Sequence, residues 1–261
     1  MDEEKYLGKL FDISCVLKDY SDYLQKKLRC PSQKVDGYEG VFLDLAIRHR
    51  ENINGTLILM QCLLENSFIK IPLAAVLRSL MADSLTSLYL YTLFVPSETK
   101  QITLENEIRC LDMEYQRFQK EVAEIEAKEI SKCDIKEREE IHGSSDKALF
   151  SRFMLQGKML SEKKKYEHIK EKMPDTDMCQ LAKQCFVYNK FFTQYYHYNP
   201  MGGLIGRTFS QEEMEIFYKA IIYSISAFRF IFPVIGRFFP KELAEKVKKN
   251  LNLLIAQYRS L

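Results

Sequence analysis

Apolar residues occupy almost every side of the helical projection of residues 72–94. A helix of this kind has to be buried inside the protein, because no polar side remains to face water. Pro72 suits the first turn of a helix, where its missing N–H has no partner to lose, and Val95-Pro96 disfavours continuation beyond Phe94. The pattern therefore predicts a central buried helix over 72–94.

Two ionisable residues, Arg78 and Asp83, interrupt this apolar stretch. Each needs a partner, because an unpaired buried charge is costly. Five residues correspond to about 500° of rotation at roughly 100° per residue, so the two side chains point apart and cannot pair along the helix. Each therefore needs a partner on another helix, and the candidates for Arg78 include Asp44, Glu65 and Tyr195. We favour a structural buried network over catalysis for these residues.

The remaining apolar positions recur at three- and four-residue steps and predict amphipathic helices, without an alternating strand pattern of useful length. The clearest helix start is at Ser210, three residues before Glu213, because S-x-x-E is the sequence of a capping box. We expect an all-α fold, a single-domain bundle over 1–261 of about seven to nine helices. Residues 72–94 and 211–232 are predicted as its two central helices.

Other helices are expected over roughly 3–29, from Tyr38 onward, and over roughly 98–130. Asn54-Gly55 has two interpretations: it either breaks the second helix or is tolerated within it. Glu and Lys dominate the run that follows Glu121, so residues 120–145 are predicted as a charged, mobile excursion from the bundle.

The composition narrows the class of protein. Apolar residues make up 46% and charged residues 28% of the chain, with only 10 Gly and 7 Pro, which argues against a disordered chain and against a turn-rich all-β fold. The formal net charge of +2 provides no overall field that would attract nucleic acid. The seven cysteines are scattered without a CxxC pair, which favours reduced thiols and a cytoplasmic location. The acidic N-terminus lacks the apolar run of a signal peptide.

The sequence contains no glycine-rich nucleotide loop, CxxC pair, HExxH or GxSxG motif, so we expect neither a cofactor nor a metal site. Three of the four histidines, His49, His142 and His168, lie in charged segments. Exposure to solvent is the expected state of a histidine in such surroundings, and we predict it for these three.

His197 differs from the other histidines because it follows an aromatic helix whose cap is Asp175 or Thr176. One interpretation is that it caps the last helical carbonyl groups, where a cation is favoured by the helix dipole. The alternative is that it faces a pocket together with arginine side chains. The residues of this candidate polar cluster are Arg78, Asp83, Tyr195, His197 and Arg229.

Residues 72–94 and 216–239 approach the length of about 20 residues that spans a bilayer. Each stretch contains an arginine, and 72–94 also contains Asp83. Each such charge costs about 2.5–3.5 kcal/mol at the centre of a membrane helix. We therefore predict buried core helices and no membrane insertion.

The sequence Leu-Arg-Ser-Leu at 77–80, followed much later by Tyr195-Tyr196-His197-Tyr198, resembles a group of uncharacterised bacterial all-helical proteins. The resemblance covers roughly residues 40–235 and implies an arginine on a long apolar helix with a late Tyr/His turn. Those relatives usually carry an acidic residue four positions after the arginine, whereas this chain has Ala82 there and Asp83 one position later.

A looser similarity is to HEPN-type helical domains, many of which are ribonucleases of defence systems. Their Arg-x(4–6)-His signature is not met here, because Arg138 and His142 have only three residues between them. We expect a cytosolic helical module that binds a protein or a small-molecule ligand, and we consider a homodimer as its assembly. The alternative is a HEPN-like ribonuclease that uses Arg78 and His197, so enzymatic activity is left open.

Overall fold

The computed structural model describes residues 38–63, 66, 69–94, 160–196, 211–235 and 241–259, together with Gly8. These residues form six α-helices and no β-strand, which confirms the all-α class for this part of the chain. The chain divides into two compact units, Met1–Val95 with Glu162–Leu261 and Pro96–Ser161. All six helices belong to the first unit.

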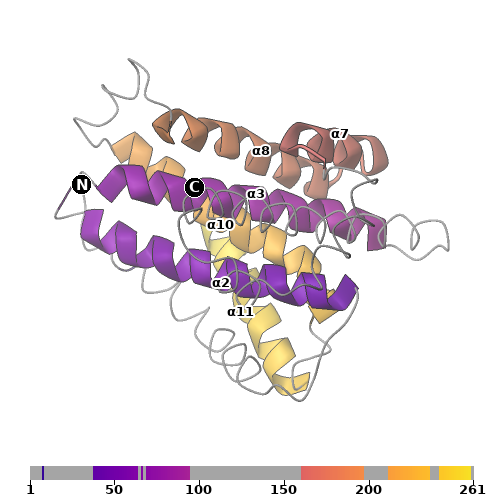
Figure 1. Cartoon of the computed structure of the whole chain (residues 1–261). Coiled ribbons are helices and arrows are strands. Elements are labelled where there is room, and N and C mark those ends of the chain that lie inside the picture. The colour runs from indigo at the N-terminus through magenta and orange to yellow at the C-terminus, as the bar shows by residue number, and fades with distance from the viewer. Residues whose placement is uncertain are drawn as a thin grey trace, which may run out of the picture. The chain divides into compact units, whose positions relative to one another are not determined.

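Helix α3 (Lys70–Phe94) is the centre of this unit. It packs against α2 (Tyr38–Leu63), α7 (Glu162–Lys172), α8 (Asp177–Tyr196) and α10 (Gln211–Ile235), as Figure 1 shows. Lys70–Leu93 is long and apolar enough to cross a membrane, but 56% of its most apolar 18-residue segment is buried inside the protein. The predicted central position of 72–94 is therefore confirmed.

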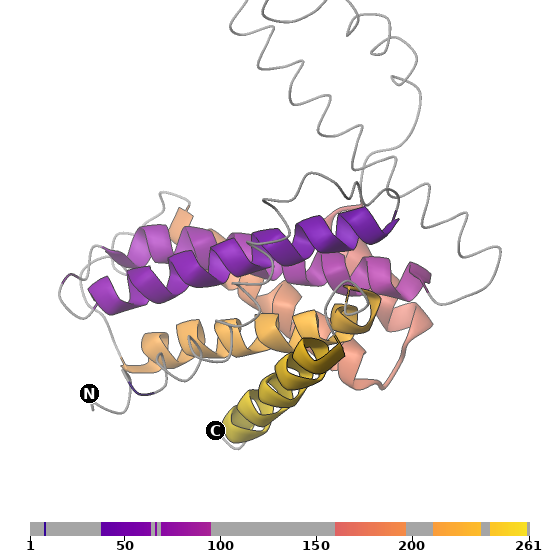
Figure 2. The same ribbon diagram turned by 90° about the horizontal axis from the view of Figure 1, so that it is seen from below.

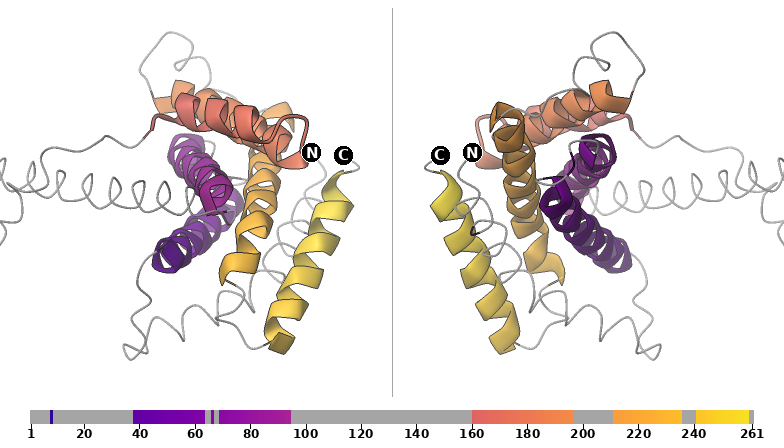
Figure 3. Two further views of the ribbon diagram at one scale, coloured as in Figure 1. Left: turned by 90° about the vertical axis from the view of Figure 1, so that its right-hand side faces the viewer. Right: turned by 90° about the vertical axis from the view of Figure 1, so that its left-hand side faces the viewer.

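Helix α10 is the second central helix, in agreement with the prediction. It packs against α2, α3, α8 and the last helix, α11 (Lys241–Arg259), and in both views of Figure 3 it lies between α11 and the α2–α3 pair. We predicted its end at residue 232, whereas the helix passes Pro233 and ends at Ile235. Ile225 and Ile231, both almost completely buried, fix its apolar side against the bundle.

Helix α2 continues without a break through Asn54-Gly55, so the second of the two interpretations is confirmed. The buried positions of α2 recur at three- and four-residue steps and hold the helix on the bundle through its packing. This packing outweighs the low helix propensity of Asn and Gly, which together cost on the order of 1 kcal/mol or more.

Replacing Gly55 by alanine is expected to raise the free energy of unfolding by about 0.5–1 kcal/mol. Gly55 lies in the middle of α2, and a Cβ atom added there meets no other atom within 4 Å. Chemical denaturation of the variant and of wild type measures the difference. The matched control is Asn54→Ala at the exposed neighbouring position, where a smaller gain is expected. A less stable Gly55→Ala variant would contradict the prediction.

A tight turn joins α7 to α8 and resolves the choice between two predicted caps. Asp175 has a positive φ of 58° in this turn, a conformation that Asp tolerates better than most residues. Thr176 is the N-cap, because its Oγ1 accepts the backbone N–H of Cys179 at 3.2 Å. Seen from below in Figure 2, α11 lies against α10.

Several predictions fall on residues that the structure does not describe. They are the helices over about 3–29 and 98–130 and the charged excursion over 120–145. The total number of helices and the single-domain organisation over 1–261 therefore stay predictions.

Candidate functional site

The described residues of the predicted polar cluster, which are all its members except His197, lie in different parts of the unit. Asp83 contacts α2, whereas Tyr195 lies beside Lys70 at the beginning of α3. Lys70 and Asp83 are about 20 Å apart along α3 at roughly 1.5 Å per residue. Arg229 is half-buried on α10, with its guanidinium 5.3 Å from the centroid of the Phe230 ring.

Arg78 is half-buried on α3, and its backbone carbonyl accepts a hydrogen bond from Nδ2 of Asn189 at 3.1 Å. Because Arg78 lies level with Asn189 and Lys70 lies level with Tyr195, α3 and α8 run antiparallel. The end of α8 is thus about 12 Å from Arg78 along the helix axis. His197 lies outside the described residues.

Asp83 binds two side chains of α2, as expected from the argument that it needs a partner on another helix. Arg48 donates from Nε to Oδ2 at 3.2 Å and from Nη2 to Oδ1 at 3.1 Å. Asn52 donates from Nδ2 to Oδ2 at 3.2 Å. Burial raises the pKa of the Asp83 carboxyl group, and the charges of Arg48 and Lys165 offset part of this rise. The contact ties α2 to α3.

A second polar contact lies in the interior, where α2, α3 and α10 meet. Nε2 of His49 is 2.6 Å from Oγ of Ser224, which is 3.1 Å from Oγ of Ser84. We call these three side chains the His49 chain. All three are buried, and the imidazole stacks on the Phe228 ring with 4.9 Å between the centroids.

The hydroxyl groups of the His49 chain also bind the backbone of α3. Ser84 donates to the carbonyl oxygen of Leu80 at 2.7 Å, because a carbonyl can only accept. The Ser84 hydroxyl is also the donor toward Oγ of Ser224, which in turn is the hydrogen-bond partner of Nε2 of His49. Nδ1 of His49 is buried and has no hydrogen-bond partner. Burial lowers the pKa of His49 to about 4, so the ring is neutral at neutral pH.

Our prediction that His49 is exposed is wrong, because its side chain is almost completely buried. The neighbouring charges Arg48 and Arg50 suggested a solvated segment. The signal that identifies His49 as an interior residue is its spacing: it follows Ala46 by three residues and precedes Ile53 by four, and both of these are buried.

Lys165 of α7 is a buried cation beside the same part of α3. Its Nζ donates to Oγ1 of Thr86 at 3.0 Å, and its charge favours ionisation of the Asp83 carboxyl group. Lys163 and Lys164, which precede it in the sequence, are exposed, so one of the three consecutive lysines is buried and two face solvent. The difference follows from their positions around the helix, since consecutive side chains are about 100° apart.

The most deeply buried ion pair joins the beginnings of α3 and α10. Nζ of Lys70, whose side chain is 1% exposed, lies 2.8 Å from Oε1 of Glu213. The hydroxyl of Tyr195 donates to the same oxygen at 2.8 Å, and Nζ of Lys70 lies 5.8 Å from the centroid of its ring. We call these residues the Lys70 cluster. Burial and the neighbouring Glu213 carboxylate raise the pKa of Tyr195 well above its ordinary value.

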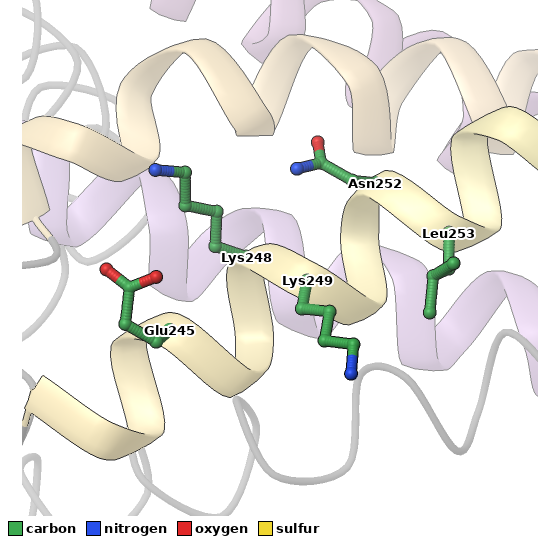
Figure 4. A pocket seen from close by; sticks show the side chains of 5 residues that line it. All are labelled: Glu245, Lys248, Lys249, Asn252 and Leu253. Carbon is green, nitrogen blue, oxygen red and sulfur yellow. The ribbon is translucent and has the colours of Figure 1, made fainter.

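The outer side of α11 contains an open depression of about 360 Å³. In Figure 4, Lys248 and Asn252 extend from one side of the helix, whereas Lys249 and Leu253 extend from the other. Glu245 completes the lining. Leu253 is 59% exposed, so an apolar side chain is accessible among charged ones.

No group of three or more His, Cys, Asp or Glu side chains in the described part of the chain is arranged to hold a metal ion. Cys185 is buried, and burial raises its pKa to about 12, so it is not a thiolate nucleophile at neutral pH. Comparison of the chain with known proteins gives no match to a protein-family model, a curated protein sequence or a solved structure.

Proposed function

We propose that the chain is a cytoplasmic helical interaction module that binds another protein through the outer side of α11. The observation that carries this proposal is the open depression around Leu253. An accessible apolar side chain on the same helix surface as Lys249, with Lys248 and Glu245 further along the depression, is compatible with a protein interface, in which a small apolar centre has a polar rim.

The contacts inside the bundle support a binding role over a catalytic one. The carboxylates of Asp83 and Glu213 are each held by side chains from other helices. His49, the described histidine with a hydroxyl partner, is buried, so a substrate has no direct access to it. These groups connect helices and thereby give α10, and with it α11, a fixed support.

Photo-crosslinking from position 253 tests the proposal. A photoreactive amino acid is placed at Leu253 and, as a control, at Val187, which is 47% exposed on α8. We expect one discrete product from position 253 and none of the same mass from position 187. A product with twice the mass of the chain identifies a second copy as the partner, and any other product identifies a different protein.

The affinity of the purified partner for wild type and for variants of the chain then shows whether Leu253 contributes to binding. Leu253→Asp is expected to weaken binding by about 30-fold or more, which is the effect of removing a hot-spot residue. Val187→Asp, the matched control, is expected to leave the affinity unchanged. Equal affinities for wild type and Leu253→Asp would overturn the proposal.

The alternative proposal is a HEPN-like ribonuclease that uses Arg78 and His197. The distance of about 12 Å along the axis between Arg78 and the end of α8 favours the interaction module. Incubation of the purified protein with RNA separates the two proposals. RNA cleavage that is lost in folded Arg78→Ala and His197→Ala variants would establish the ribonuclease, whereas intact RNA with wild-type protein would exclude it under those conditions.

A further inference from the structure

The His49 chain connects α2 to both central helices through groups that cannot accommodate a second proton. His49 is on α2, Ser84 is on α3, and Ser224 and the stacked Phe228 ring are on α10. Nε2 is bound to Ser224, and Nδ1 has no partner. A second proton on the ring therefore creates a buried charge, which the backbone of Ser224 offsets only in part, and it leaves Nδ1–H without an acceptor.

We propose that α2 is an acid-releasable helix, which separates from α3 and α10 when His49 takes up a proton. In the released state the imidazolium is solvated by water, so the proton is bound there more tightly than in the packed state. Mass action then shifts the local opening equilibrium of α2 toward release as the pH falls.

The charged groups around this contact do not provide an acceptor for the new proton. Arg48 and Arg50 flank His49 on α2, and Arg229 is next to Phe228 on α10. All three are cations, so none of them can accept the new proton. From α3, the carboxylate of Asp83 is the neighbouring anion, and it is already bound by Arg48 and Asn52.

Protonation of Asp83 and protonation of His49 have opposite effects on the release of α2, so substitutions can separate the two contributions. Burial in the packed state raises the pKa of Asp83 above 3.8, its value when α2 is released, so acid favours the packed state through this group. Burial lowers the pKa of His49 from 6.5 to about 4, so acid favours release in the window between these values. Removing each group should therefore change the acid response in opposite directions.

Hydrogen exchange of the full chain tests the proposal, with protection factors corrected for the intrinsic exchange rates at each pH. Between about pH 7.5 and pH 5, the two pKa values of His49 predict a loss of protection in α2 of about 30-fold. Protection of α8, which has no place in the His49 chain, is expected to stay unchanged. Equal losses in α2 and α8 would show unfolding of the whole unit and overturn the proposal.

Two substitutions identify the titrating group. His49→Gln keeps a polar side chain beside Ser224 but cannot take up the proton, so its α2 protection is expected to stay constant or to rise as the pH falls over this range. Asp83→Asn retains a polar partner for Arg48 and removes the opposing titration, so the loss is expected to be as large as in wild type or larger. An unchanged loss in His49→Gln would contradict the proposal.

A second measurement covers the case in which His49→Gln fails to fold. In a variant that retains only His49, with the other three histidines replaced by glutamine, the imidazole proton signals report its charge directly. We expect the ring in the packed state to titrate far below the released-state pKa of 6.5, so that protection of α2 already falls while the ring of the packed molecules is still neutral. A fully protonated His49 at about pH 5 in a chain whose α2 keeps its protection would overturn the proposal.

Discussion

Replacing Glu213 by alanine is expected to lower the free energy of unfolding by about 3–5 kcal/mol. The substitution removes the carboxylate that lies 2.8 Å from Nζ of Lys70, a side chain that is 1% exposed. It also removes the acceptor of the Tyr195 hydroxyl. A buried ammonium group then loses this carboxylate at a place that water reaches poorly, and less of the desolvation cost of its charge is offset.

Chemical denaturation followed by circular dichroism measures this effect, and α10 provides a matched control. Glu215 is two residues further along and pairs with Lys219 at 3.8 Å, but its side chain is 60% exposed. Glu215→Ala is expected to cost less than about 0.5 kcal/mol, since exposed ion pairs contribute little. If Glu213→Ala and Glu215→Ala lower the free energy of unfolding by similar amounts, burial does not make the Lys70–Glu213 pair more important than an exposed pair.

A double variant tests whether the loss in Glu213→Ala comes from the charge left on Lys70. Lys70→Met with Glu213→Leu replaces both members of the ion pair by apolar side chains, so neither of these two charges remains. Its stability is expected to exceed that of Glu213→Ala, because apolar replacement of a whole buried pair is often neutral. If the double variant is less stable than Glu213→Ala, the Lys70 cluster must stabilise the unit by more than the neutralisation of one buried charge by the other.

The fold of the described residues was predictable because a few strong local signals agree with each other. The continuous apolar character of 72–94 and the S-x-x-E start near 210 correspond to the two helices that contact most of the others. The end of α10 was misjudged, because the propensity rule stops a helix at Pro233 whereas tertiary packing extends it to Ile235. Val234, which is 5% exposed, contributes to that packing.

The polar contacts were predictable only in part. Arg78 and Asp83 lie on one apolar helix, so the need for partners on other helices followed from helical geometry. The identity of the partners of Asp83 did not, because Arg48 and Asn52 belong to a helix 31 to 35 residues away in the sequence. The burial of His49 was missed because we gave the charges of its neighbours more weight than its helical phase, whereas helical phase decides burial.

Replacing Phe192 by alanine is expected to lower the free energy of unfolding by about 3–5 kcal/mol, the range for truncation of a buried aromatic residue. Phe192 of α8 is completely buried. Its ring centroid lies 5.6 Å from that of Phe217 on α10 and 5.4 Å from that of Phe191. Both neighbours belong to packed helices, so the cavity left by the ring can collapse only in part.

The part of this loss in the free energy of unfolding that comes from the contact between α8 and α10 can be measured separately. Val187→Ala on the exposed side of α8 is the matched control and is expected to cost less than about 0.5 kcal/mol. A double-mutant cycle with Phe217→Ala is expected to give a coupling of about 0.5–1.5 kcal/mol, typical of an aromatic pair. Additive losses would mean that the two rings stabilise their helices independently. A coupling in the expected range would show that Phe192 and Phe217 fasten α8 to α10 next to the Lys70 cluster, since the Tyr195 ring also lies 5.9 Å from Phe217.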